Sequence, residues 1–184
     1  MSILSILEVP DPRLKTISRP VEVFDDALRT LIADMFETMY DAPGIGLAAI
    51  QVGVPKRLLV MDLQEEGIDG EAVRSPRVFI NPEILDPSQH VATYSEGCLS
   101  VPDQYADVDR PAQIRARWQD ADGTIYEENM DGLMATCLQH EMDHLEGILF
   151  IDHLSRLKRQ MVLKKLDKYR KSGGAHVHGE HCNH

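Results

Sequence analysis

The chain has 184 residues, and its 43% hydrophobic and 27% charged content is ordinary for a soluble globular protein of one domain or at most two small ones. The net charge of −11 argues against general nucleic-acid binding. No apolar run approaches the roughly 20 residues of a membrane-spanning helix, so we expect no membrane association.

The first half predicts one helix and one buried strand. Asp25 and Asp26 are suited to cap a helix, and apolar residues follow at spacings of three and four: Leu28, Leu31, Ile32, Met35 and Met39. Pro43 and Gly44 break this helix. Residues 57–63 predict a buried strand, and the acidic, glycine-containing residues 65–76 predict an exposed loop or hairpin.

The second half predicts further short strands and two helices. Residues 78–80 and 91–94 are strand candidates, and residues 114–119 and 124–128 flank an Asp-Ala-Asp-Gly turn typical of a hairpin. A helix is expected at about 132–146, closed by Gly147. A final amphipathic helix follows, and its apolar side is formed by Leu154, Leu157, Met161, Val162, Leu166 and Tyr169.

The helix at 132–146 contains a pattern that indicates a metal site. His140 and His144 are four residues apart and share one helix face, so both imidazoles can reach one cation. Glu141 lies close enough to handle protons on a metal-bound water. Two surface histidines and a solvated glutamate are the alternative, but Leu133, Thr136 and Cys137 continue the histidine face.

A catalytic metal site needs a third protein ligand. Downstream candidates are Glu146, Asp152 and His153, of which Glu146 is too near His144 to bend back onto the same cation. Upstream, Cys98 could supply a thiolate, and a buried structural cysteine is the alternative. The residues alone leave this choice open.

A glycine-containing segment forms a further candidate site at Gly44–Gln51. Gly44 and Gly46 would let a substrate backbone approach closely, and the Gln51 amide is a neutral hydrogen-bond donor. A phosphate-binding loop is the competing interpretation, but no Lys-Ser/Thr pair follows the glycines.

Together, three segments resemble the motifs of the peptide deformylase family of bacterial type: Gly44–Gln51, Glu96–Ser100 and Gln139–His144, in that order. The similarity spans about residues 5–165. It implies an enzyme that removes the N-formyl group from the N-terminal formylmethionine of newly made proteins and releases formate. The fold we expect is α+β, with short antiparallel strands around a central metal-site helix, an N-terminal helix and a C-terminal amphipathic helix.

The resemblance also implies roles for individual residues. Cys98, His140 and His144 would hold the metal, with Glu141 as general base and acid. The Gln51 side chain and the Leu99 backbone N–H would stabilise the oxyanion. The family's usual ion is Fe²⁺, with Ni²⁺ or Co²⁺ as substitutes, although the ligands alone slightly favour Zn²⁺.

The substrate contacts expected from this resemblance lie around the same helix face. An apolar pocket for the methionine side chain would be lined by Ile45, Leu133 and Cys137. The extended peptide would pair with the backbone of Ile45–Gly46 and Gly97, and Gly44 is counted with the substrate-binding residues. We expect a strong preference for formyl over acetyl groups.

The chain also departs from some family members at the substrate rim. Tyr105 stands where they have an arginine, and Arg110 remains as a nearby cation.

The C-terminal region has its own charge and composition. Residues 155–171 contain eight basic side chains and one acid, Asp167, and resemble the ribosome-docking helix of bacterial members near the exit tunnel. A solvated helix face is the alternative. We expect a single catalytic domain at 1–171 and a disordered, His-rich tail at 172–184 whose metal affinity is incidental.

Cellular context and assembly follow from simple features. Residues 1–6 lack a basic stretch and a cleavage site, and three cysteines (98, 137 and 182) form no disulfide framework. We therefore expect a cytoplasmic protein, most simply a monomer.

Two other functions compete with deformylation. A zinc metallopeptidase of the His-Glu-x-x-His kind would need a downstream ligand and would leave Cys98 unexplained. A non-catalytic metal-binding protein would have a closed four-ligand site and would not depend on Glu141.

Overall fold

The computed structural model describes residues 2–67 and 69–172, and most of the expected tail therefore lies outside the described residues. Its α-helices are α1 (Asp26–Asp41), α2 (Gly132–Leu145) and α3 (Arg156–Lys171), and its short 3₁₀ helices are η1 (Pro12–Lys15), η2 (Ala49–Val52) and η3 (Phe150–His153). The strands are β1 (Gly46–Ala48), β2 (Leu58–Met61), β3 (Glu65–Glu66), β4 (Ala72–Val73), β5 (Arg77–Pro87), β6 (Val91–Cys98), β7 (Val101–Pro111), β8 (Gln113–Gln119) and β9 (Ile125–Asp131).

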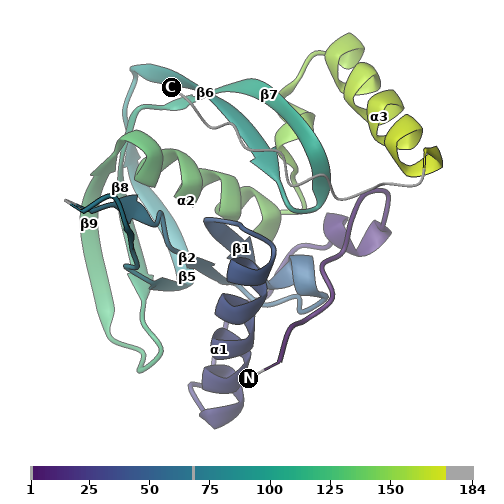
Figure 1. Ribbon diagram of the computed structural model, residues 1–184. Coiled ribbons are helices and arrows are strands. Elements are labelled where there is room, and N and C mark those ends of the chain that lie inside the picture. Colours follow the sequence, from purple (N-terminus) through teal and green to yellow (C-terminus); the bar gives the residue numbers. More distant parts are fainter. Residues whose placement is uncertain (1, 68, 173–184) are drawn as a thin grey trace.

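The strands form one larger sheet and two hairpins, all antiparallel. The larger sheet has the order β1-β2-β5-β8-β9, and the hairpins are β3-β4 and β6-β7. Helix α2 lies between the sheet and the β6-β7 hairpin, with α1 and α3 on the outside (Figure 1). The expected α+β fold with a central helix is confirmed.

Strand β2 shows how the sequence builds two apolar layers. Its side chains alternate between faces, as in any strand. Leu59 and Met61 join a core cluster with α2, whereas Leu58 and Val60 join a second cluster with α1. Because all four side chains are buried, the two helices cover opposite faces of this end of the sheet.

Helix α1 confirms the predicted apolar stripe. Asp25 caps it, since its side chain accepts a hydrogen bond from the Leu28 backbone N–H at 2.9 Å. Four residues of the stripe are buried: Leu28, Ile32, Met35 and Met39. The helix ends just before Pro43, as expected.

Strand β5 is longer than the segment 78–80 that the sequence predicts. It continues to Pro87 through a register shift between Ile80 and Glu83. Asn81 lies at this shift with φ +50°, and its side chain bonds both the N–H and the C=O of Val21. The irregular backbone around Pro82 interrupts the alternating pattern that would have extended the prediction.

Helix α3 only partly follows the predicted apolar side. Val162 and Leu166 are buried against β7 and η3, but Leu157 and Met161 have exposed fractions of 68% and 51%. The predicted apolar side is therefore buried only in part, because α3 packs on the hairpin along a narrow strip only. No helix among the described residues is both long and apolar enough to cross a membrane.

Gly147 ends α2 in a conformation that a side chain would disturb. Its φ is +71°, and a Cβ there would lie 2.5 Å from the Lys15 carbonyl oxygen. Gly53 has φ +80°, but its Cβ would have ample space.

We predict that Gly147→Ala lowers the free energy of unfolding by about 2–4 kcal/mol, measured by urea denaturation. Gly53→Ala is the matched control and should cost only about 1 kcal/mol, from its left-handed backbone alone. Equal losses in the two variants would contradict the steric role of Gly147.

Candidate active site

Three metal-ligating side chains meet where the end of β6 faces α2. The donor atoms of Cys98, His140 and His144 all lie within 4.8 Å of one another. The Cys98 Sγ is 3.3 Å from His144 Nε2, and the two imidazole rings meet edge to face. The structure therefore brings together the three residues that the sequence analysis grouped.

The surroundings of this cluster fit a divalent metal ion. His140 Nδ1 is 2.8 Å from a Glu96 carboxylate oxygen, which leaves Nε2 for a metal and makes the ring a better donor. Among the described residues, three buried side-chain atoms have no hydrogen-bond partner, and two of them belong to this site, namely His144 Nδ1 and Glu141 Oε2. One thiolate and two imidazoles are a set of three protein ligands, which is typical of catalytic metal sites.

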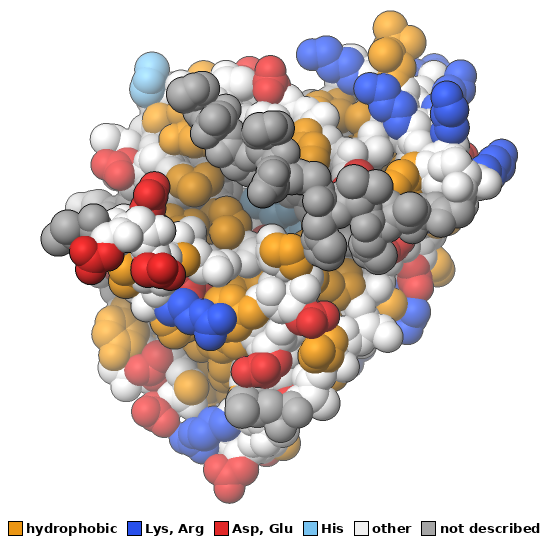
Figure 2. Space-filling model, in the orientation of Figure 1, with side chains coloured by type: hydrophobic (Ala, Val, Ile, Leu, Met, Phe, Trp, Pro, Cys, Tyr) orange, Lys and Arg blue, Asp and Glu red, His pale blue; other side chains and the backbone are white. Residues whose placement is uncertain are grey.

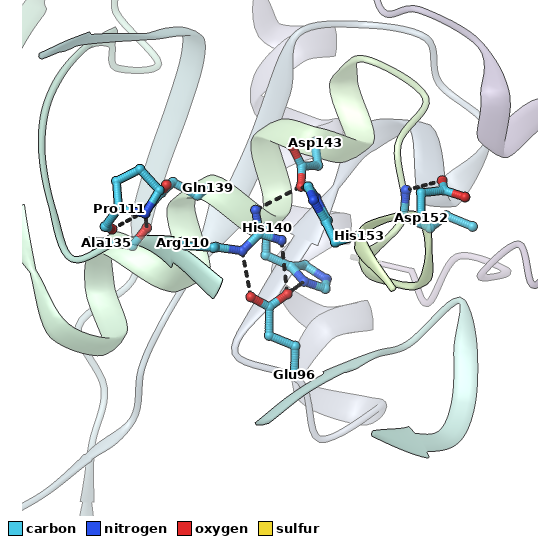
Figure 3. A network of polar contacts seen from close by, with 10 residues as sticks. Glu96, Arg110, Pro111, Ala135, Gln139, His140, Asp143, Asp152 and His153 are labelled. Atoms are coloured by element: carbon cyan, nitrogen blue, oxygen red, sulfur yellow. Dashed lines mark hydrogen bonds and ion pairs between the residues drawn. The ribbon is translucent and has the colours of Figure 1, made fainter. Parts of the chain in front are cut away.

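The orientation of His140 depends on a buried ionic network (Figure 3). The Arg110 guanidinium donates to both Glu96 oxygens, at 2.5 and 2.9 Å, and to Asp143 at 2.8 Å. Burial by itself would raise the pKa of Glu96, but hydrogen bonds from His140 and Arg110 lower it to about 2. The network also reaches His153, whose Nε2 lies 2.7 Å from Asp143.

The position of Arg110 in this network differs from the expected one, and Glu96 and Asp143 gain a role that the sequence did not predict. Arg110 is only 5% exposed, so it is not a cation at the substrate rim. Glu96 and Asp143 lie inside the recognised motifs, but their role depends on a distant arginine that no spacing could indicate.

The downstream ligand candidates are engaged elsewhere. His153 bonds Asp143, Asp152 accepts hydrogen bonds from Lys15 Nζ and the Leu149 N–H, and Glu146 pairs with Arg57. None of them belongs to the metal-ligating cluster among the described residues. The arrangement expected for an ordinary His-Glu-x-x-His peptidase is therefore not formed.

Glu141 lies beside the cluster and against β1. It is 4% exposed, and a Cβ on Gly46 would lie 2.5 Å from its Oε1. Only glycine at position 46 allows β1 to pass this close to the carboxylate. Burial raises the pKa of Glu141 to about 7.

The two expected oxyanion donors flank Cys98. The Gln51 amide in η2 donates to Ser100 Oγ at 3.1 Å and lies 3.5 Å from Cys98 Sγ, and its oxygen accepts from the Ala48 N–H. Leu99 follows Cys98 directly in the turn between β6 and β7. Both donors therefore border the metal-ligating cluster.

The predicted substrate-binding residues lie on α2, on β6, and on β1 with the two residues before it. Cys137 is buried with its Sγ 3.9 Å from the Ile45 carbonyl oxygen, and burial raises the pKa of this thiol. Leu133, in the first turn of α2, is 43% exposed. Gly97 lies opposite Tyr105, whose side chain is 71% exposed.

Two unpaired strand edges border the site. Strand β1, which contains Gly46, is the terminal strand of its sheet, and β6, which contains Gly97, pairs only with β7. Gly44 precedes β1, and a Cβ there would collide with the Leu99 side chain. Open edges of this kind accept an extended peptide through main-chain hydrogen bonds.

Comparison with known proteins agrees with this geometry. The family model described as polypeptide deformylase matches residues 3–160. Peptide deformylases of Rhizorhabdus wittichii and Novosphingobium aromaticivorans are 72% and 67% identical to the chain, covering 94% of it in each case and 98% and 100% of their own lengths. The crystal structure of peptide deformylase from Ehrlichia chaffeensis in complex with actinonin matches with a TM-score of 0.86 and 45% identity, covering 93% of this chain and 99% of that one. The chain therefore belongs to the peptide deformylase family, hydrolases that remove the N-formyl group from the N-terminal formylmethionine of newly made proteins.

Proposed function

We propose that the site around Glu141 hydrolyses the formyl group of N-formylmethionyl peptides and releases formate. The observation that carries this proposal is the buried Glu141 carboxylate beside three metal-ligating side chains, with the Gln51 amide next to Cys98. A peptidase is disfavoured because the downstream ligand candidates are engaged in other contacts.

Each residue has a defined part in the proposed reaction. A metal held by Cys98, His140 and His144 would polarise the formyl carbonyl and lower the pKa of a water molecule towards about 7. Glu141 takes the proton of the attacking water and later delivers a proton to the departing amine. The Gln51 amide and the Leu99 N–H donate to the formyl oxygen as negative charge develops on it.

The same arrangement selects the substrate. Ile45, Leu133 and Cys137 line the pocket for the methionine side chain, while the peptide backbone pairs with Gly46 and Gly97 on the two open edges. The crowded site admits a formyl hydrogen and excludes an acetyl methyl group. Main-chain hydrogen bonds depend little on the side chains of the substrate, so the site tolerates many different residues after the first methionine.

The identity of the metal is part of the proposal. We propose Fe²⁺ as the physiological ion because it is the usual ion of the family. Ni²⁺, Co²⁺ or Zn²⁺ can substitute, since one thiolate and two imidazoles suit each of these ions.

Helix α3 is the proposed contact with the ribosome. Basic side chains gather over this helix (Figure 2). Arg159 and Arg170 pair with Asp152 and Glu8. Among the described residues, six further basic side chains of α3 form no ion pair: Arg156, Lys158, Lys164, Lys165, Lys168 and Lys171. Free cations of this kind favour ribosomal RNA or acidic ribosomal protein near the exit tunnel. Cytoplasmic location and a monomeric state stay predictions.

The central test is formate release from a formyl-Met tripeptide by anaerobically prepared, iron- or nickel-loaded protein. We expect rapid release from this substrate and none from the acetyl-Met tripeptide. Glu141→Ala should lower the turnover number by about 10²–10⁴-fold, because the proton carrier is lost. No release in any metal form would contradict the proposed function, and cleavage of an internal peptide bond would favour the peptidase.

A second test concerns the third ligand. Cys98→Ser should lower the affinity for Co²⁺ at least about tenfold, measured by titration, because a thiolate is replaced by a poor ligand. Cys137→Ser is the matched control and should leave this affinity unchanged. Both variants keep the His-rich tail, so their difference reports on the site alone; equal affinities would remove Cys98 from the ligand set.

A third test concerns α3. Replacement of Lys164, Lys165 and Lys168 by glutamine should make ribosome binding less dependent on salt. In co-sedimentation, the negative slope of log binding constant against log salt concentration should decrease in magnitude by about 2–3. The control replaces Arg19, Lys56 and Arg115, which lie outside α3, by glutamine and should leave the slope unchanged. Equal slopes for the two triple variants would argue for a solvated helix face.

A further inference from the structure

Asp62 is a buried carboxylate that the proposed mechanism does not use. It follows β2 directly and is only 1% exposed. The Tyr40 hydroxyl donates to one of its oxygens at 2.6 Å, and the backbone N–H groups of Gln64 and Ser75 donate to the other, both at 3.0 Å. One side chain thus joins the end of α1 to the residues on both sides of the β3-β4 hairpin.

The charge of this group is compensated by its neighbours. Burial would raise the pKa of Asp62, but the hydrogen bonds from Tyr40, Ser75 and Gln64 outweigh burial and hold the pKa below its usual value. The same contact and burial raise the pKa of Tyr40 to about 12. The Arg74 guanidinium lies over the Tyr40 ring at 4.2 Å. At neutral pH, a carboxylate therefore faces a protonated hydroxyl in a satisfied network.

This network contacts the carbonyl groups of the two residues that precede β1. The Asp62 N–H donates to the Ile45 carbonyl at 2.9 Å. The Gln64 side chain donates to the Gly44 carbonyl at 3.1 Å. Gln64 has φ +51°, a conformation that the bond from its N–H to the Asp62 carboxylate helps to hold.

The two contacts define which part of β1 stays open. Backbone groups of neighbouring residues in an antiparallel strand point in opposite directions. Because Ile45 is bonded to Asp62 on the β2 side, the backbone groups of Gly46 face the free edge. On that edge, the Gly44 carbonyl is occupied by Gln64 and the Ala48 N–H by Gln51. Two glutamine side chains thus limit the open stretch to Gly46.

We propose that Asp62 is a positioning residue that, through Tyr40 and Gln64, holds residues 44–46 in place for pairing with the substrate backbone. This inference rests on the proposed function, because it requires a peptide that pairs with Gly46. Loss of the network weakens peptide binding and leaves the metal-ligating cluster and the chemical step intact.

Two conservative variants test the proposal without removing the carboxylate. Tyr40→Phe deletes only the hydroxyl that donates to Asp62. Gln64→Asn tolerates the positive φ but is one methylene too short to reach the Gly44 carbonyl. We expect each to raise KM for a formyl-Met tripeptide about threefold to tenfold, with kcat and bound metal unchanged, because interactions made equally in ground and transition states are lost.

The controls separate positioning from general destabilisation. Tyr126 also donates to an aspartate, Asp120, in the turn between β8 and β9, so Tyr126→Phe should leave KM unchanged. N-formylmethionine amide lacks the extended backbone, and its KM should rise less than that of the tripeptide in both variants.

Each outcome decides the question. The positioning role would be overturned if the variants showed an unchanged KM for the tripeptide, an equal rise in KM for both substrates, or a loss of kcat or bound metal. The proposed function would still stand in these cases, provided that the wild type releases formate. Absence of formate release by the wild type would overturn both.

Discussion

The carboxylate of Glu96 joins the two halves of the site. It lies on β6, accepts hydrogen bonds from Arg110 on β7, and fixes the ring of His140 on α2. A buried charge is costly unless its oxygens are occupied, and a buried ion pair adds little net stability over apolar side chains of the same size. This ion pair therefore contributes mainly to orientation, because it holds the hairpin that carries Cys98 in a fixed position relative to the helix that carries both histidines.

Enclosure of α2 has a second effect on the chemistry. The sheet covers one side of the helix and the β6-β7 hairpin covers the other. His140, Glu141 and His144 are therefore all buried, although polar residues of this kind usually lie on the protein surface. Side chains on a packed helix are held more precisely than side chains on loops. The open edges of β1 and β6 then provide access without loosening the helix.

The sequence predicted those features whose causes are local. The capped helix α1 and the histidine face of α2 follow from spacings of three and four residues, and the turn between β8 and β9 follows from its residue types. The third ligand could be predicted only from the resemblance, because Cys98 is far from His140 in sequence. The geometry of the cluster then agreed with that choice.

Other features depend on contacts between distant residues and were missed. Strand β7 was not predicted because its buried residues include the polar Gln104 and Arg110, which a sequence pattern places on the surface. Strand β5 continues past Asn81 because that side chain bonds Val21, 60 residues earlier in the chain. The exposure of Leu157 likewise reflects how little of α3 the hairpin covers.

The close approach of β1 to Glu141 limits how this enzyme can escape inhibition. A side chain of any size at position 46 would collide with the Glu141 carboxylate, to which the proposed mechanism gives the proton transfers. A ligand that pairs with the backbone of Gly46 would therefore contact atoms that no substitution at that position can alter without displacing Glu141. Resistance would have to arise elsewhere, for example at Leu133 in the proposed methionine pocket, which is 43% exposed.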